Sequence, residues 1–288
     1  IRIEHLPEGW CGKNHAMQKG ITAARGDWLC LIDADCRQTS PRSLRTAAAY
    51  AVENNTDLLS VLPRLELHSF WEHVVQPVCS GLMMVWFTPE KVNDPRRPHA
   101  YANGAFMLFR RGAYERIGTH EAVRDQVNED MHMAARVKWA GLKLRVMRND
   151  GLYTVRMYSS LRQILRGWSR IFYGTFGTLR RLTASLVLLI VMGLTPYAAA
   201  AFGWIAWALG AEPAGLMLAC AIVGTVAVAA QISVMFRWFP LCNARAELGW
   251  TYLLGCGVAT VALVQAIGKL RKGAAVTWRN TTYRKNGQ

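Results

Sequence analysis

No Cys-x-x-Cys pair occurs in this sequence, although the chain contains seven cysteines. Zinc ribbons are built on such pairs, and disulfide-rich folds need cysteines at a much higher density. The cysteines are scattered over the whole chain, at Cys11, Cys30, Cys36, Cys79, Cys220, Cys242 and Cys256. We therefore interpret them as ordinary buried thiols of a reducing compartment, and we exclude a zinc or disulfide framework.

Acidic residues are scarce: 19 Asp and Glu stand against 34 Lys and Arg, which gives a formal net charge of +15. Nucleic acid is one class of partner for so basic a chain, but the sequence has no basic strand interleaved with aromatic residues. The basic residues gather instead beside apolar segments, at Arg162, Arg166, Arg170, Arg180 and Arg181 and again at Lys269, Arg271 and Lys272. This placement favours anionic lipid headgroups on the cytoplasmic side of a membrane, with no nucleic-acid partner.

Charged residues make up only 18% of the chain, whereas hydrophobic residues make up 52% and are unevenly spread. Residues 1–181 have the mixed pattern of a soluble α/β domain. Three apolar stretches follow, at 182–209, 215–236 and 248–268, and each reaches the roughly 20 residues that cross a bilayer. Three crossings place the tail outside, yet its basic residues argue for the inside. A kink or hairpin at Thr195-Pro196 therefore stays open.

The chain also lacks an initiating methionine. It begins Ile1-Arg2-Ile3-Glu4, which alternates like a strand that is entered midway. We therefore expect an N-terminal part to precede Ile1, and a signal peptide is neither visible nor excluded.

Two carboxylates, Asp33 and Asp35, follow the apolar run from Trp28 to Ile32. Such a run predicts a strand that is buried on both faces of a parallel sheet, and ligands bind beyond the carboxyl ends of such strands. Two hard oxygen ligands there could hold Mg²⁺ or Mn²⁺. Taken alone, however, Asp-Ala-Asp fits a solvated strand end better than a metal site.

Three further motifs are ambiguous when each is considered alone. Lys13 precedes a predicted helix over residues 14–24 with Asn14 as its cap, where it can meet a phosphate or simply be solvated. Asn103-Gly104 precedes an apolar strand and allows close approach to a ligand, although a plain turn explains it too. Glu129 and Asp130 open a helix predicted over 126–141, where acids are commonly only dipole partners.

The remaining pattern predicts helices over 40–52, opened by Ser40-Pro41, and over 70–87. Strands are predicted over 57–67, 142–147 and 152–158, with a loop over 88–102. Residues 159–176 predict an amphipathic, basic helix that lies in a membrane interface. This helix carries Gln163, Arg166 and Trp168.

In this order, the motifs resemble those of the membrane-bound inverting glycosyltransferases of family 2. The resemblance covers residues 6–181, from the Lys13 helix through Asp-x-Asp, Asn-Gly and Glu-Asp to Gln163-x-x-Arg166-x-Trp168. It implies an α/β fold of the GT-A type, a Rossmann-like nucleotide-diphospho-sugar transferase domain, followed by α-helical transmembrane segments. Bacterial carotenoid and hopanoid glycosyltransferases and ceramide glucosyltransferases are the similar members.

The resemblance also implies roles for individual residues. Asp130 would be the general base, beside Glu129. Asp33 and Asp35 would bind the donor and a Mg²⁺ or Mn²⁺ ion, with Lys13 on the donor phosphates. Gln163, Arg166 and Trp168 would close over the donor, although the inserted Gly167 rotates Trp168 by about 100° on a helix. Asn103 and Gly104 would lie on the acceptor side.

These roles imply a hexosyltransferase that moves a sugar from a nucleotide-sugar donor, most simply a UDP-sugar, to a hydroxyl of a membrane lipid, with inversion. The expected location is the bacterial inner membrane, as a multi-pass protein with a cytoplasmic catalytic domain. A processive polysaccharide synthase of the cellulose or hyaluronan type is one alternative, and it needs a channel of several spans. An inactive membrane scaffold is another.

The expected domains are a catalytic domain over 1–158, an interfacial helix over 159–181, transmembrane helices over 182–268 and a basic tail over 269–288. The family's first nucleotide-binding strand should lie upstream of Ile1, so we expect the catalytic domain to be incomplete here.

Overall fold

The computed structural model describes residues 1–271, 276–278 and 281–283. The chain forms two compact units, one of residues 1–66 and 84–157 and the other of residues 67–83 and 158–288. Of the predicted basic tail, residues 272–275, 279–280 and 284–288 lie outside the described residues.

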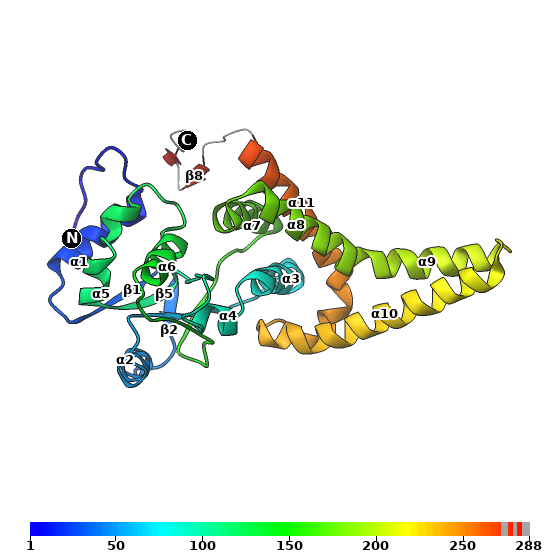
Figure 1. Ribbon diagram of the computed structural model, residues 1–288, viewed down its shortest axis with the longest axis horizontal. Helices are drawn as coiled ribbons and strands as arrows, with labels where there is room; N and C mark the ends of the chain where they lie inside the picture. The colour runs from blue at the N-terminus through cyan, green and yellow to red at the C-terminus, as the bar shows by residue number, and fades with distance from the viewer. Residues whose placement is uncertain (272–275, 279–280, 284–288) are drawn as a thin grey trace. The chain divides into compact units, whose positions relative to one another are not determined.

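The first unit is a mixed α/β domain built on two small sheets (Figure 1). The main sheet has the order β1-β5-β3-β6, in which β5 pairs antiparallel with β1 and β3, while β3 and β6 are parallel. The second sheet has the order β2-β7-β4. The elements of the unit are α1 (Gly12–Ala23), β1 (Trp28–Ile32), β2 (Cys36–Gln38), α2 (Ser43–Glu53), β3 (Leu58–Val61), β4 (Arg64–Leu65), α4 (Pro89–Asn93), β5 (Phe106–Arg110), α5 (Arg111–Arg116), the 3₁₀ helix η1 (His120–Val123), α6 (Glu129–Trp139), β6 (Leu144–Met147) and β7 (Tyr153–Val155).

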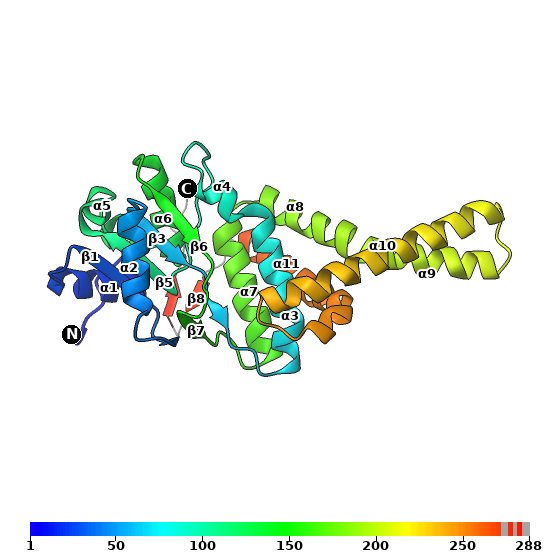
Figure 2. The ribbon, with the colours of Figure 1, turned by 90° about the horizontal axis from the view of Figure 1, so that it is seen from below.

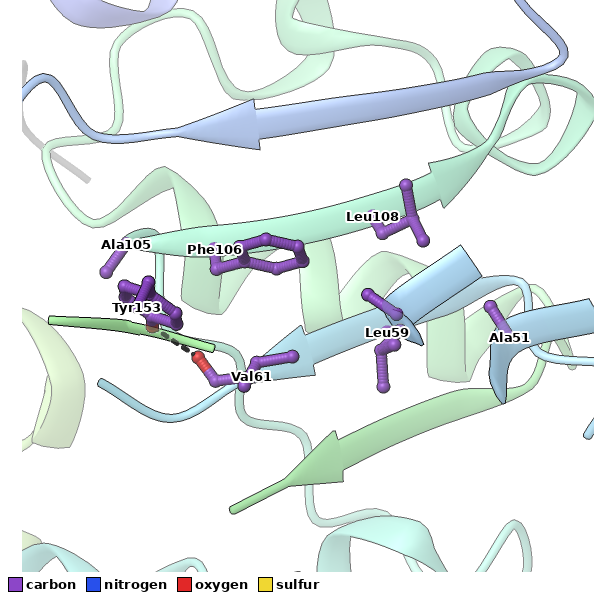
Figure 3. Packing of buried hydrophobic residues seen from close by; sticks show 8 residues of the cluster. Ala51, Leu59, Val61, Ala105, Phe106, Leu108 and Tyr153 are labelled. Carbon is purple, nitrogen blue, oxygen red and sulfur yellow. Dashed lines mark hydrogen bonds between the residues drawn. The ribbon is translucent and has the colours of Figure 1, made fainter. Parts of the chain in front are cut away.

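Alternate residues of the central strands face two different layers of helices. Leu59 and Val61 of β3 pack with Phe106 of β5 and with Ala51 of α2, as Figure 3 shows. Tyr153 closes this cluster, because its hydroxyl donates to the carbonyl of Val61 at 2.7 Å. Helices α5 and α6 lie on the opposite face of the sheet from α2 (Figure 1). Because helices cover both faces, all four residues of β3 and the first four residues of β5 are buried.

The strand from Trp28 to Ile32 forms as predicted, but its surroundings differ from the prediction. Leu29 and Leu31 are buried while Cys30 between them is exposed, and β1 pairs antiparallel with β5. The expectation of a parallel strand buried on both faces is therefore wrong for the described residues. An apolar run does not distinguish a two-sided strand from a one-sided strand whose outer positions are also apolar.

Several predicted boundaries also need correction. Helix α1 begins at Gly12, so Asn14 lies inside the helix and is not its cap. Helix α2 begins at Ser43, because Ser40 and Pro41 belong to a preceding turn. The strand predicted over 57–67 divides into β3 and β4, which belong to different sheets. Proline has no N–H for a strand ladder, and Pro63 lies at the division.

The second unit is helical and contains three helices long and apolar enough to cross a membrane. These span Leu179–Ala208, Ala214–Leu241 and Ala246–Leu270. The elements are the part of α3 (Phe70–Trp86) up to residue 83, α7 (Leu161–Phe176), α8 (Leu179–Leu189), the π-helical turn η2 (Ile190–Leu194), α9 (Thr195–Ala208), α10 (Ala214–Leu241), the 3₁₀ helix η3 (Ala246–Thr251), α11 (Tyr252–Arg271), and the antiparallel pair β8 (Val276–Trp278) and β9 (Thr281–Tyr283).

A π-helical turn interrupts the first apolar stretch before Pro196, so this stretch is one interrupted helix and not a hairpin. Helices α9 and α10 form a hairpin (Figure 2). Their backbones approach closely at two glycines that leave no room for a side chain. A Cβ on Gly203 would clash with Ala221, and a Cβ on Gly224 would clash with Ala200. Small residues at such crossings are typical of helix pairs in membranes, where close van der Waals packing replaces the hydrophobic effect.

Candidate active site

Antiparallel pairing of β1 with β5 brings the end of one strand beside the start of the other. Ile32 is paired with Phe106, so the next residue of β1, Asp33, comes beside the turn that precedes β5. The Asp33 amide donates to the carbonyl of Ala105 at 3.4 Å. The Asp-Ala-Asp motif and the Asn-Gly motif therefore lie together, although 70 residues separate Asp33 from Asn103 in the sequence.

Asn103 builds the turn in front of β5. Its side-chain oxygen accepts from the Ala105 amide at 3.0 Å, which closes an Asx turn. Its backbone is fastened to Ser60 of β3, whose hydroxyl accepts from the Asn103 amide at 2.8 Å and donates to the Asn103 carbonyl at 3.2 Å. Sequence reasoning missed Ser60, because a serine within a strand carries no signal of its buried partner.

The turn aims one backbone N–H at the acidic pair. The Gly104 amide donates to Oδ2 of Asp130 at 2.9 Å, and the Met131 amide donates to Oδ1 at 2.8 Å. Both Asp130 oxygens are therefore held by the backbone, at the start of α6. Burial raises the pKa of Asp130, although Lys13 and these two amides oppose the shift.

Lys13 lies at the centre of the acidic groups. Its Nζ atom is 2.6 Å from Oε1 of Glu129 and 2.8 Å from Oδ1 of Asp33. Burial alone would lower the pKa of Lys13, but the carboxylates of Glu129 and Asp33 outweigh burial and raise it. The lysine is thus held as a cation, and it keeps two carboxylates from different elements in one place.

Glu129 is the most enclosed of these groups, with only 2% of its surface exposed. Burial raises the pKa of Glu129, and the neighbouring Asp130 adds to this while Lys13 opposes it. A buried carboxylate is tolerated only when it is paired. Because Glu129 forms an ion pair with Lys13, Asp130 is the better placed of the two acids to accept a proton from a substrate.

Asp33 follows the end of β1 directly and is half-buried. Asp35 lies two residues further along the chain and is exposed. No group of three or more His, Cys, Asp or Glu side chains suited to a metal occurs in the part of the chain that the structure describes. A magnesium-type ion in nucleotide enzymes needs only one or two carboxylates, since substrate phosphates and water complete its shell. The role of Asp33 and Asp35 as metal ligands stays a prediction, and Asp35 is the more exposed of the two.

A second set of residues, Gln18, Tyr114 and His120, fixes α1, which carries Lys13. Gln18 accepts from the hydroxyl of Tyr114 and from the amide of His120, each at 3.1 Å. Tyr114 and Nδ1 of His120 are 2.7 Å apart. Burial and the nearby charge of Lys13 lower the pKa of His120 to about 4, so this histidine is neutral.

The predicted residues Gln163, Arg166 and Trp168 belong to α7 in the second unit. Gln163 and Arg166 are exposed, and Gln163 accepts from the amide of Ser159 at 2.9 Å. Trp168 is buried, and its indole N–H donates to Gln76 of α3 at 2.7 Å. Trp168 therefore packs α7 against α3 within its own unit, and the donor-binding roles of the three residues stay predictions.

The structure explains why a glycine stands at position 167, the residue inserted in the motif. A Cβ at Gly167 would clash with the ring and hydroxyl of Tyr158, which folds back onto α7. The ring of Tyr158 therefore packs directly on the backbone of Gly167 and leaves no room for a side chain at that position.

Comparison with known proteins identifies the family. Residues 1–170 match the family described as "Glycosyltransferase like family 2". The chain belongs to this family. The expectation of an α/β domain of the GT-A type, followed by apolar helices, is thereby confirmed, and so is the assignment to glycosyltransferase family 2.

The family 2 chain is similar over 182 residues, at 24% identity, to the 4,4'-diaponeurosporenoate glycosyltransferase of Staphylococcus aureus (strain USA300). That match covers 62% of this chain and 48% of the relative, so the chain spans about half the length of the curated relatives it matches. The enzyme of the same name from strain MRSA252 is 25% identical over 184 residues, with the same coverage of 62% and 48%.

Among solved structures, a mannosyltransferase from Pyrobaculum calidifontis, in complex with GDP-Man and Mn²⁺, is similar at a TM-score of 0.41 and 14% identity. The similarity covers 90% of this chain and 66% of that chain.

Proposed function

We propose that the protein is an inverting, metal-dependent glycosyltransferase that moves a sugar from a nucleotide-sugar donor to a hydroxyl of a membrane lipid. The observation that carries this proposal is the carboxylate of Asp130, which two backbone amides hold beside the pair formed by Lys13 and Glu129. Family membership supplies the reaction class. The inversion, the metal and the acceptor are the proposed parts.

In this proposal, Asp130 is the general base. The acceptor hydroxyl gives its proton to Asp130 as its oxygen forms a bond to the anomeric carbon. The bond between that carbon and the phosphate oxygen breaks on the opposite side, and the nucleoside diphosphate leaves with the bonding electrons. General-base help of this kind typically contributes about 10²–10⁴-fold in rate.

Lys13 supports the departure of the diphosphate. Its ammonium group is kept charged by Glu129 and Asp33, and it lies at the end of β1 where a donor would bind. A divalent cation held by Asp35 and Asp33 would neutralise the charge that develops on the leaving group. We propose Mg²⁺ or Mn²⁺, because both prefer oxygen ligands.

The proposed acceptor is a lipid because the chain couples a family 2 domain to three helices of membrane-spanning length. Helix α7 adds a basic, amphipathic segment of the kind that lies in a membrane interface. We propose that the catalytic domain is cytoplasmic, as the basic residues near the spans suggest. The similar enzyme from Staphylococcus aureus, named for a carotenoid-type acid, is consistent with a lipid acceptor.

A transfer assay on the intact protein in membranes tests the proposal. Membranes with radiolabelled UDP-sugars or GDP-sugars and Mn²⁺ should give a product that organic solvent extracts. Analysis of that product by NMR should show the anomeric configuration opposite to that of the donor. Insoluble polymer would instead identify a polysaccharide synthase, and the absence of any transfer, with retained nucleotide binding, would identify an inactive scaffold.

A further inference from the structure

Asn14, the residue after Lys13, has a fully buried side-chain amide in the first turn of α1. Its Nδ2 atom lies 2.7 Å from the carbonyl oxygen of Val123, 2.9 Å from that of Gln126 and 3.2 Å from that of Arg124. An amide group has two N–H donors, so these three carbonyls take up all its donor capacity. No helix-capping or phosphate-binding role for Asn14 is compatible with this arrangement, since its amide faces the protein.

The three carbonyls belong to one short segment, residues 123–126, and this segment leads directly into α6. The Cys11 amide binds the same Arg124 carbonyl at 2.6 Å, just before α1 begins. Only two residues separate Gln126 from Glu129. One segment therefore holds the start of α1, which carries Lys13, and continues into the residue whose carboxylate pairs with Lys13 at 2.6 Å.

The backbone that delivers this segment is held in an uncommon conformation. Gly118 has φ +89° and the following Thr119 has φ +58° with ψ −169°, a region that is strained for a residue with a side chain. Thr119 keeps this conformation because its amide donates to the Tyr114 carbonyl at 3.1 Å and its hydroxyl accepts from the Glu121 amide at 3.3 Å. The segment is thus a defined support and its shape does not depend on α1 alone.

We propose that Asn14 is a positioning residue, which fixes the ammonium group of Lys13 against Glu129 and Asp33 by tying the first turn of α1 to residues 123–126. Asn14 touches no substrate in this proposal and acts only through Lys13. The proposal rests on the function proposed above in assigning Lys13 to the donor phosphates. Its structural part, the placement of Lys13, stands independently of that function.

A double-mutant cycle on transfer activity tests the coupling between the two residues. In the intact membrane protein, Asn14→Ala should lower kcat about 10-fold or more. In a Lys13→Ala background, the same change should lower kcat by less than about 2-fold, because the group that it positions is already absent. The control is Asn93→Ala, which removes a comparable amide that binds the backbone of Val146 at 3.0 Å and 2.6 Å, remote from α1. Equal losses from Asn14→Ala in both backgrounds would overturn the proposal.

A chemical readout separates this proposal from the proposed function. Acetic anhydride labels lysine amines, and mass spectrometry of the Lys13 peptide measures the rate. Asn14→Ala should raise the labelling rate of Lys13 at least about 5-fold and leave that of the exposed Lys19 unchanged. Faster labelling in a protein without transferase activity would uphold the positioning role and refute the proposed function. An unchanged rate at Lys13, in a variant that melts as the wild type does, would refute the positioning role.

Discussion

The backbone amide of Gly104 donates a 2.9 Å hydrogen bond to Oδ2 of Asp130, and a side chain at Gly104 would intrude on the same cluster. A Cβ there would lie 3.1 Å from Nζ of Lys13, 3.4 Å from Oδ2 of Asp130 and 3.5 Å from Oε1 of Glu129. Gly104 thus donates a hydrogen bond to Asp130, and its missing side chain leaves a gap beside the charged groups. It lets a strand turn approach three charged groups, and this makes the turn part of the candidate site.

Replacing Gly104 should damage activity more than folding. In Gly104→Ala, the new methyl group presses on the flexible end of Lys13, which can move at little cost to the fold. We expect kcat to fall about 10-fold, which corresponds to about 1.4 kcal/mol, with the melting temperature within about 2 °C of wild type. Gly112→Ala is the matched control, because a Cβ at Gly112 meets nothing within 4 Å. Unchanged transfer by Gly104→Ala would show that the gap has no role in activity.

Asp130→Asn should leave donor binding intact and lower kcat by about 10²–10⁴-fold, since the amide cannot accept the hydroxyl proton. Calorimetric titration with the nucleoside diphosphate and radiolabel transfer measure the two quantities. Near-native transfer by this variant would refute the assignment of the base.

The pH profile gives a second test of Asp130. A base must be unprotonated, and burial raises the pKa of this carboxyl. Activity should therefore be full above the raised pKa and should fall as the pH drops through it, at a higher pH than the ordinary Asp value of about 3.9. Measurement of kcat between pH 4 and pH 9 should show this acidic limb displaced upward. A limb at the ordinary value would exclude a buried base.

Removal of the metal should abolish transfer. Treatment with EDTA should lower activity at least about 100-fold, and Mn²⁺ or Mg²⁺ should restore it. Asp35→Asn should raise the metal concentration needed for half-maximal activity about 10-fold or more, because the more accessible carboxylate is lost. Asp150→Asn is the control, an exposed acid in the turn before β7. Full activity in EDTA would exclude a metal-dependent mechanism.

Gly167→Ala should destabilise the helical unit, because Tyr158 occupies the space that a methyl group would need. Overpacking of this kind costs about 1–3 kcal/mol, and the thermal midpoint of the detergent-solubilised protein should fall by several degrees. Gly268→Ala, where a Cβ meets nothing within 4 Å, should leave the midpoint unchanged. Tyr158→Ala should largely rescue Gly167→Ala. Failure of this rescue would mean that Gly167 matters for another reason.

Local sequence determined much of this protein. Apolar runs predicted the three long helices, because a bilayer sets a minimum length for an apolar span. The helix predicted over 159–176 forms as α7 from Leu161 to Phe176, and Ser160 caps it, since its hydroxyl accepts from the Gln163 amide at 3.4 Å. The ordered motifs gave the family and the GT-A type of fold, which the match over residues 1–170 confirms.

Tertiary structure alone decided how the candidate site is assembled. The antiparallel register of β1 and β5 places Asp33 beside Ala105, and the support at residues 123–126 places Lys13 beside Glu129. The roles of Ser60 and Asn14 could not be recognised from the sequence. Both side chains bind backbone groups, and almost every residue type carries the same backbone groups. Periodicity records which face of an element is buried, whereas the partner of a buried polar group depends on contacts between residues far apart in the chain.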